Sequence, residues 1–245
     1  KRKIKRRKMA QKAGTFDPES DERFPFHQND LKYHYIKPKD KDNSAAVIFF
    51  LMDVSGSMSQ DRKYLARSFF FLLYQFLNHK YERVEVVFIS HSTHADRVNE
   101  NDFFKVATNG GTIISSCLNL ELDIIEKEFH PNSWNIYTFY CGDGENWHSD
   151  NETSLDLFKK IKDLSQLTGY CEINETYKGL ADDDDDQTFG ISSWATFSAW
   201  KNEEMENLWA KLGPLCDNKF KKVMIGDTNH IWAAFKDLFG AKTKS

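Results

Sequence analysis

The sequence contains few cysteines and no long hydrophobic run. Four cysteines occur among its 245 residues, far apart and without a C-x-x-C pair. Their spacing gives neither a zinc site nor the disulfide framework of a small secreted protein. No apolar stretch approaches the roughly 20 residues of a membrane span, and no signal peptide is visible. We therefore expect a cytoplasmic protein with free thiols and no membrane partner.

Familiar catalytic motifs are also absent. The sequence has no GxxxxGK[ST] phosphate loop, no GxGxxG after the first predicted strand and no GxSxG nucleophile elbow. A phosphatase of the Asp-x-Asp type would need a carboxylate at position 55, where Ser55 stands. His91 and His94 remain open as a metal pair or a general base, although they end a predicted strand, where a polar or capping role is more common. These absences favour a protein that is not an enzyme.

Charge is distributed unevenly along the chain. The formal net charge is −4, which argues against a general nucleic-acid binder. Residues 1–8 nevertheless read KRKIKRRK, and residues 182–186 are five consecutive aspartates. The basic run is either a solvated tail or a surface for RNA or an acidic partner, and the acidic run is either a solvated loop or a neighbour of a binding site. We expect no nucleic-acid partner.

Residues 1–44 differ in composition from the rest of the chain. They are polar and charged, are interrupted by Pro18, Pro25 and Pro38, and contain one candidate strand at 31–37. We expect this segment to be an arm with a basic N-terminus, the remnant of a longer N-terminal region.

From residue 45 to residue 240, apolar strands alternate with amphipathic helices. The expected strands are 45–53, 84–91 with its hairpin partner 95–99, 134–141, 169–174 and 221–226; the expected helices are 62–80, 115–129, 154–167, 196–212 and 230–239. Such alternation indicates βαβ units with right-handed crossovers. The sequence therefore predicts an α/β domain, a doubly wound, mostly parallel sheet flanked by helices, followed by a tail at 241–245.

Oxygen-bearing side chains follow two of these strands. Asp53, Ser55 and Ser57 come at the end of the first strand, and Asp143 follows another strand. Thr112 lies in a loop rich in Gly and hydroxyls ahead of the second helix. In a doubly wound sheet, ligands bind outside the carboxyl ends of the strands. Hard oxygen ligands without His or Cys suit Mg²⁺, Mn²⁺ or Ca²⁺.

A simpler interpretation of the same residues remains open. Ser57 or Ser59 would cap the first helix, and Asp143 would form a turn with Gly144. No metal would then be needed.

The whole constellation resembles the metal-ion-dependent adhesion site of von Willebrand factor type A domains. That pattern is Asp-x-Ser-x-Ser, matched at residues 53–57, then Thr112, then Asp143. The stretches FFLMDVSGSM, YERVEVVFISH, GGTIISS and DGENW are similar to one bacterial and archaeal subgroup, the YeaH/YhbH-type proteins. Two features depart from it: Gly142 stands where a Ser is expected, and the aspartate run at 182–186 is peculiar to this chain.

The resemblance implies a Rossmann-like fold and one divalent cation. Ser55, Ser57 and Thr112 would coordinate Mg²⁺, or Mn²⁺ or Ca²⁺, directly, and Asp53 and Asp143 would do so directly or through water. A vacant position on the cation would accept a carboxylate from a protein partner. The rim around that position would be formed by Gly111, Glu145, Asn146 and Trp147, although Trp147 is equally explained as packing under its loop.

The resemblance also implies a cellular setting. In the family resembled, the gene is commonly found beside a PrkA-type serine kinase with an AAA+-like ATPase region and beside a SpoVR-like protein. We therefore expect a kinase or AAA+ ATPase as partner and a role in stress response or sporulation. The alternative function is a metal-dependent hydrolase of a phosphorylated substrate, which would need a general base near the metal.

Overall fold

A computed structural model describes residues 2–19, 23–24, 44–105, 108, 110–174 and 208–240. The chain divides into two compact units, Lys1–Asp42 and Asn43–Ser245. None of the helices in the described part of the chain is long and apolar enough to cross a membrane.

The first unit contains the helix α1, Arg2–Lys12. Two of its arginines lie over aromatic rings: the guanidinium of Arg6 is 5.4 Å from the ring centre of Phe24, and that of Arg7 is 5.4 Å from Phe16. The two rings meet edge to face at 5.1 Å. The apolar pattern did not predict this helix, because its sequence carries almost no apolar face, but Lys, Arg, Met, Ala and Gln all have high helix propensity.

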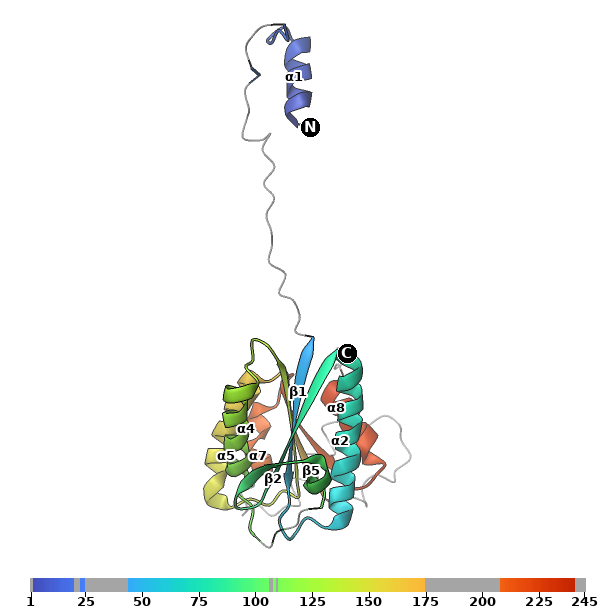
Figure 1. The fold of residues 1–245 in the computed structure, drawn as a ribbon, viewed down its shortest axis with the longest axis vertical. Coiled ribbons are helices and arrows are strands. Elements are labelled where there is room, and N and C mark those ends of the chain that lie inside the picture. Colours follow the sequence, from blue (N-terminus) through green and yellow to red (C-terminus); the bar gives the residue numbers. More distant parts are fainter. Residues whose placement is uncertain are drawn as a thin grey trace. The chain divides into compact units, whose positions relative to one another are not determined.

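The second unit is built on a six-stranded sheet in the order β3-β2-β1-β4-β5-β6 (Figure 1). The strands are β1 Ala45–Asp53, β2 Arg83–His91, β3 Ala95–Val98, β4 Asn135–Gly142, β5 Leu167–Ile173 and β6 Phe220–Ile225. β3 pairs antiparallel with β2, and every other pair is parallel. The predicted fold class, a doubly wound and mostly parallel α/β sheet, is confirmed.

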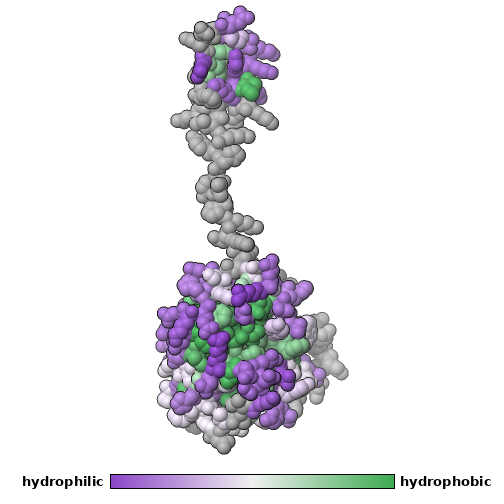
Figure 2. Space-filling view, in the orientation of Figure 1, coloured by the Kyte–Doolittle hydropathy of each residue, from purple (hydrophilic) through white to green (hydrophobic). Residues whose placement is uncertain are grey.

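Helices cover both faces of the sheet, with α2 and α8 on one side and α4 and α5 on the other (Figure 1). The helices are α2 Gln60–Lys80, α3 Glu100–Phe103, α4 Ile114–Glu128, α5 Asn151–Leu164, α7 Leu208–Lys211 and α8 His230–Phe239, with 3₁₀ turns at His148–Asp150 and Gly213–Leu215. Polar residues dominate the helix surfaces, and hydrophobic residues reach the surface between the two helical layers (Figure 2).

β1 is the central strand, and its alternating side chains divide the core in two. Val47, Phe49 and Leu51 pack under α4 and α5, whereas Phe50 and Met52 pack under α2 and α8. All are buried. Burying each such side chain contributes about 1.5–3 kcal/mol, so β1 fixes the position of its own carboxyl end firmly.

The strand order reverses at β1, since β2 and β3 lie on one side of it and β4 to β6 on the other. The loops after β1 and β4 therefore leave the carboxyl ends of these strands toward opposite faces of the sheet. Ligands of doubly wound sheets bind at this switch point.

The predicted elements mostly match the observed ones. The helix expected at 196–212 is described only over Leu208–Lys211. The candidate strand at 31–37 and the aspartate run at 182–186 lie outside the described residues.

Candidate metal centre

Asp53, the last residue of the central strand β1, is completely buried at the carboxyl end of that strand. Its Oδ1 accepts a hydrogen bond of 2.8 Å from the backbone N–H of Ser55. The next residue, Val54, donates its N–H to the carbonyl of His91 on the neighbouring strand, at 2.9 Å. The chain therefore leaves β1 in a fixed direction, with the Asp53 carboxylate held in place.

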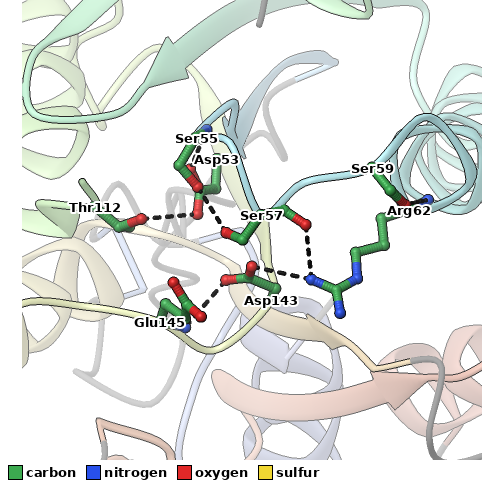
Figure 3. Close-up of polar contacts among 8 residues, drawn as sticks. All are labelled: Asp53, Ser55, Ser57, Ser59, Arg62, Thr112, Asp143 and Glu145. Atoms are coloured by element: carbon green, nitrogen blue, oxygen red, sulfur yellow. Dashed lines mark hydrogen bonds and ion pairs between the residues drawn. The ribbon is translucent and has the colours of Figure 1, made fainter. Parts of the chain in front are cut away.

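Ser57 and Ser59 have different roles. Ser59 is the N-cap of α2, because its Oγ accepts the N–H of Arg62 at 3.2 Å. Ser57 points the other way, with its Oγ 3.0 Å from the Oγ of Ser55 (Figure 3). The capping interpretation therefore holds for Ser59 and leaves the Ser57 hydroxyl beside that of Ser55.

Thr112 reaches the same place from the loop ahead of α4. Its Oγ1 donates to Oδ2 of Asp53 at 3.2 Å, and the Thr112 side chain is buried. The loop is anchored on both sides: Ile113 donates its N–H to the carbonyl of Ser92 at 2.8 Å, and Trp147 donates its N–H to the carbonyl of Thr112 at 3.1 Å.

Asp143 follows β4 and forms the turn with Gly144 that the sequence left open as an interpretation. Its Oδ1 accepts the N–H of Glu145 at 3.1 Å, in a tight turn at which Gly144 has a φ of +85°. Its Oδ2 accepts a hydrogen bond and ion pair of 3.1 Å from Nη1 of Arg62, which also donates to the carbonyl of Ser57 at 2.9 Å. The turn therefore directs the carboxylate toward the loop after β1 (Figure 3).

The structure thus brings the five oxygen donors predicted from the sequence into one cluster, from three separate loops. The members are Asp53, Ser55, Ser57, Thr112 and Asp143. Within the described residues no group of three or more His, Cys, Asp or Glu side chains is placed to hold a metal. This cluster contains two carboxylates, and its other donors are hydroxyls.

The donor chemistry and spacing fit a small hard cation. Mg²⁺ takes oxygen ligands at about 2.0–2.1 Å in octahedral geometry, which places adjacent ligands about 2.9 Å apart. The Oγ atoms of Ser55 and Ser57 are 3.0 Å apart. Burial raises the pKa of Asp53 to about 6; the N–H of Ser55 opposes this rise and the nearby Asp143 adds to it. A cation would compensate the charge of this buried carboxylate.

The four rim residues differ in what their side chains contact. Glu145 and Gly111 are exposed. Asn146 accepts the N–H of Ile114 at 3.1 Å and donates to Oδ1 of Asn151 at 2.9 Å, so its side chain holds the start of α4. Trp147 is 53% exposed, and its indole covers Gly111 so closely that a Cβ there would lie 2.5 Å from Nε1.

The two histidines do not form a pair. His94 is exposed, and its Nδ1 is 3.1 Å from Oγ1 of Thr93. His91 is buried 5.5 Å from the ring of Tyr140, and burial lowers the pKa of its imidazole to about 4. A neutral, enclosed imidazole is a packing residue rather than a surface base.

Several neighbours of the cluster were not identified from the sequence. The hydroxyl of Tyr140 explains the missing serine at position 142, because a Cβ on Gly142 would lie 2.5 Å from it. The buried carboxylate of Glu172 likewise lies so close to Gly144 that a Cβ there would clash with it. Arg62 lies 81 residues from Asp143 along the chain, and no local pattern connects the two.

The fold and the cluster define a class: doubly wound α/β domains with oxygen donors gathered at the carboxyl ends of the central strands. The chain belongs to the family described as "Protein of unknown function (DUF444)", whose model matches residues 1–242.

Curated relatives carry the name "UPF0229 protein". One from Ruminiclostridium cellulolyticum is 41% identical over 226 residues, which cover 90% of this chain and 57% of that protein. One from Clostridium perfringens is 50% identical over 151 residues, which cover 62% of this chain and 38% of that protein. The chain spans about half the length of the curated relatives it matches.

Solved structures share parts of the fold at low identity. An aerotolerance-related membrane protein from Bacteroides fragilis is 15% identical, with a TM-score of 0.46 over 79% of this chain and 96% of that chain. The ArnB paralog VWA2 from Sulfolobus acidocaldarius is 12% identical, with a TM-score of 0.38 over 54% of this chain and 35% of that chain.

Proposed function

We propose that the chain is a von Willebrand factor A-like domain that binds a protein partner through a divalent cation. Ser55, Ser57 and Thr112 supply hydroxyl ligands, and Asp53 and Asp143 supply carboxylates, directly or through water. Mg²⁺ is the expected cation, with Mn²⁺ or Ca²⁺ as substitutes. The observation that supports this most is the convergence of these five oxygen donors, from three loops, at the switch point of the sheet.

The chemistry of such a site favours binding over catalysis. A dication bound directly by neutral hydroxyls, with a carboxylate acting through water, keeps part of its charge, and a ligand position left to solvent takes an anionic oxygen. An Asp or Glu side chain of the partner fits that position. Glu145 and Trp147 follow Asp143 closely in the sequence, and the side chains of both are exposed. They offer contacts that select the partner.

The proposed setting follows the resemblance to YeaH/YhbH-type proteins. The partner would be a PrkA-type serine kinase or another AAA+ ATPase, with a SpoVR-like protein in the same system, in stress response or sporulation. The hydrolase alternative has less support, because it needs a general base at the metal. His91, the residue paired with Asp53 in the sheet, is buried, and its pKa of about 4 makes it a weak base.

The site is tested by titrating the protein with Mn²⁺ and Mg²⁺ in a calorimeter. Wild type should bind one ion, and Asp53→Asn and Thr112→Val should weaken binding at least about tenfold, the loss typical of disturbed metal shells. Both replacements keep the size of the side chain, so the fold should survive. Unchanged affinity in both variants would refute the assignment.

Two serines two residues apart provide a matched control. Ser57→Ala should weaken metal binding, because it removes a proposed ligand. Ser59→Ala should leave metal affinity unchanged and lower the free energy of unfolding by about 1 kcal/mol, because it removes only the cap of α2. If Ser57→Ala left the metal affinity unchanged and lowered the free energy of unfolding instead, Ser57 would be a capping residue and not a ligand.

Partner binding is then tested by capture on immobilised wild type and Asp53→Asn, each with Mg²⁺ and with chelator.

A further inference from the structure

Arg62 lies in the first turn of α2, three residues after the cap Ser59, and contacts the proposed metal centre from one side (Figure 3). One nitrogen, Nη1, donates both to the carbonyl of Ser57 at 2.9 Å and to Oδ2 of Asp143 at 3.1 Å (Figure 3). The Asp143 side chain is 2% exposed and that of Arg62 is 25% exposed. The ion pair is therefore largely enclosed, with only its basic partner open to solvent.

Each carboxylate around the centre already has a basic neighbour. Asp143 pairs with Arg62, the charge of Asp53 acts on the buried Lys63, and the charge of Glu172 acts on Lys222. A divalent cation that binds Asp53 and Asp143 places its two positive charges close to these basic groups. Its nearest positive neighbour is then the guanidinium that already contacts Asp143.

Both oxygens of Asp143 are engaged when Arg62 is in place. Oδ1 accepts the N–H of Glu145, and Oδ2 accepts Nη1 of Arg62. Of these two donors, the backbone N–H is fixed by the turn at Gly144, whereas the arginine is a long, partly exposed side chain. An approaching cation therefore gains full use of Asp143 by displacing the arginine.

We propose that Arg62 is a built-in competitor of the divalent cation for Asp143 and thereby sets the metal affinity of the site. This inference rests on the proposed metal-dependent function. Removing the charge of Arg62 should tighten metal binding, because a unit charge within a few ångströms of a dication in a partly buried site is strongly repelled. Arg62 keeps the site organised without metal and limits how much metal it takes up.

The experiment is a calorimetric titration with Mn²⁺ at constant ionic strength on four proteins. Arg62→Gln removes the charge and keeps an N–H donor in the side chain; Arg62→Lys keeps the charge. Arg67→Gln is the matched control, since Arg67 lies on the same helix but stacks 5.4 Å from the ring centre of Phe104. It changes the net charge equally without touching Asp143. Melting temperatures show whether each variant is folded.

We expect Arg62→Gln to bind Mn²⁺ at least about tenfold more tightly than wild type. Arg62→Lys and Arg67→Gln should stay within about threefold of wild type. Equal affinity of Arg62→Gln and wild type would overturn the competitor role alone and leave the metal site intact. Weaker binding by Arg62→Gln would also overturn it, because Arg62 would then organise the Ser57 loop for the metal. Absence of binding by wild type and Arg62→Gln alike would overturn both the competitor and the site.

Discussion

Glu121 is a carboxylate enclosed by protein. It lies on α4, is completely buried, and accepts a hydrogen bond from the hydroxyl of Thr138 on β4. Burial raises the pKa of Glu121 from its ordinary 4.5 to about 8, and the bond from Thr138 opposes this rise. The side chain is therefore largely protonated in the folded protein at neutral pH. Its role is in packing, away from the proposed metal centre.

Glu121 should make the protein less stable as pH rises from 4.5 to 8. In this window the unfolded chain has released the proton and the folded chain retains it, so the free energy of unfolding falls by up to about 1.4 kcal/mol per pH unit. Glu121→Gln removes this contribution and keeps an acceptor for Thr138. Urea unfolding at pH 5, 6.5 and 8 should show the variant gaining on wild type as pH rises. Parallel pH dependence in the two proteins would contradict the buried protonated carboxyl.

Gly142 and Tyr140 should be energetically coupled. Because a Cβ at position 142 would meet the Tyr140 hydroxyl at 2.5 Å, Gly142→Ala should cost about 1–3 kcal/mol of stability, as overpacking does. Tyr140→Phe removes the oxygen, so the double variant should recover part of that loss. A double-mutant cycle measured by urea unfolding tests this. Additive effects of the two changes would show that the hydroxyl is not the obstacle.

At the scale of elements, α4 depends on a distant loop for its first turn. The residue at its N-cap, Ile113, offers no side-chain acceptor. Asn146 instead accepts the N–H of Ile114, and Asp150 accepts the N–H of Ser115 at 3.0 Å. The loop after β4 thus carries Asp143 into the proposed metal centre and also caps the helix that follows Thr112.

Removing this cap should weaken α4 without touching a proposed ligand. Asn146→Ala is expected to lower the free energy of unfolding by about 1 kcal/mol, the usual loss for an N-terminal cap. Glu145→Ala is the control, because Glu145 is exposed and contributes its backbone N–H, which the variant keeps, to the turn at Asp143. The two variants are compared by urea unfolding. Equal stabilities would show that Asn146 contributes nothing as a cap.

The elements themselves were largely predictable from the sequence. The run AAVIFFLMD predicted β1, because a short continuous apolar run followed by turn residues is typical of a strand buried on both faces. The clustering of Asp53, Ser55, Ser57 and Asp143 was predictable because these residues follow parallel strands whose carboxyl ends meet at one edge of the sheet. The cap of α4 was not predictable, since its acceptors lie 32 and 35 residues away along the chain. The contact of Arg62 with Asp143 was not predictable for the same reason. The helix α1 was not predicted, because an apolar pattern indicates packing and not helix propensity.

At the scale of the whole molecule, the described core belongs to the second unit. Every buried hydrophobic residue in the described part of the chain lies between Ala46 and Leu238. In the first unit, the described contacts that involve aromatic rings join α1 to Phe16 and Phe24. The two units are therefore expected to unfold independently.

Removing residues 1–28 should leave the α/β unit folded and its metal affinity unchanged. The deletion takes away α1 and the rings beneath its arginines but none of the buried residues of the sheet or its helices. The melting temperature should stay within about 2 °C of wild type, because a change of 1 kcal/mol moves a domain of this size by about 2–4 °C. Calorimetric melting of the two proteins, followed by Mn²⁺ titration, tests both statements. The titration is run at about 0.15 M ionic strength, at which the charge lost with the basic segment is largely screened from the metal site. A much lower melting temperature for the truncated protein would mean that the N-terminal unit packs on the α/β unit and contributes to its stability.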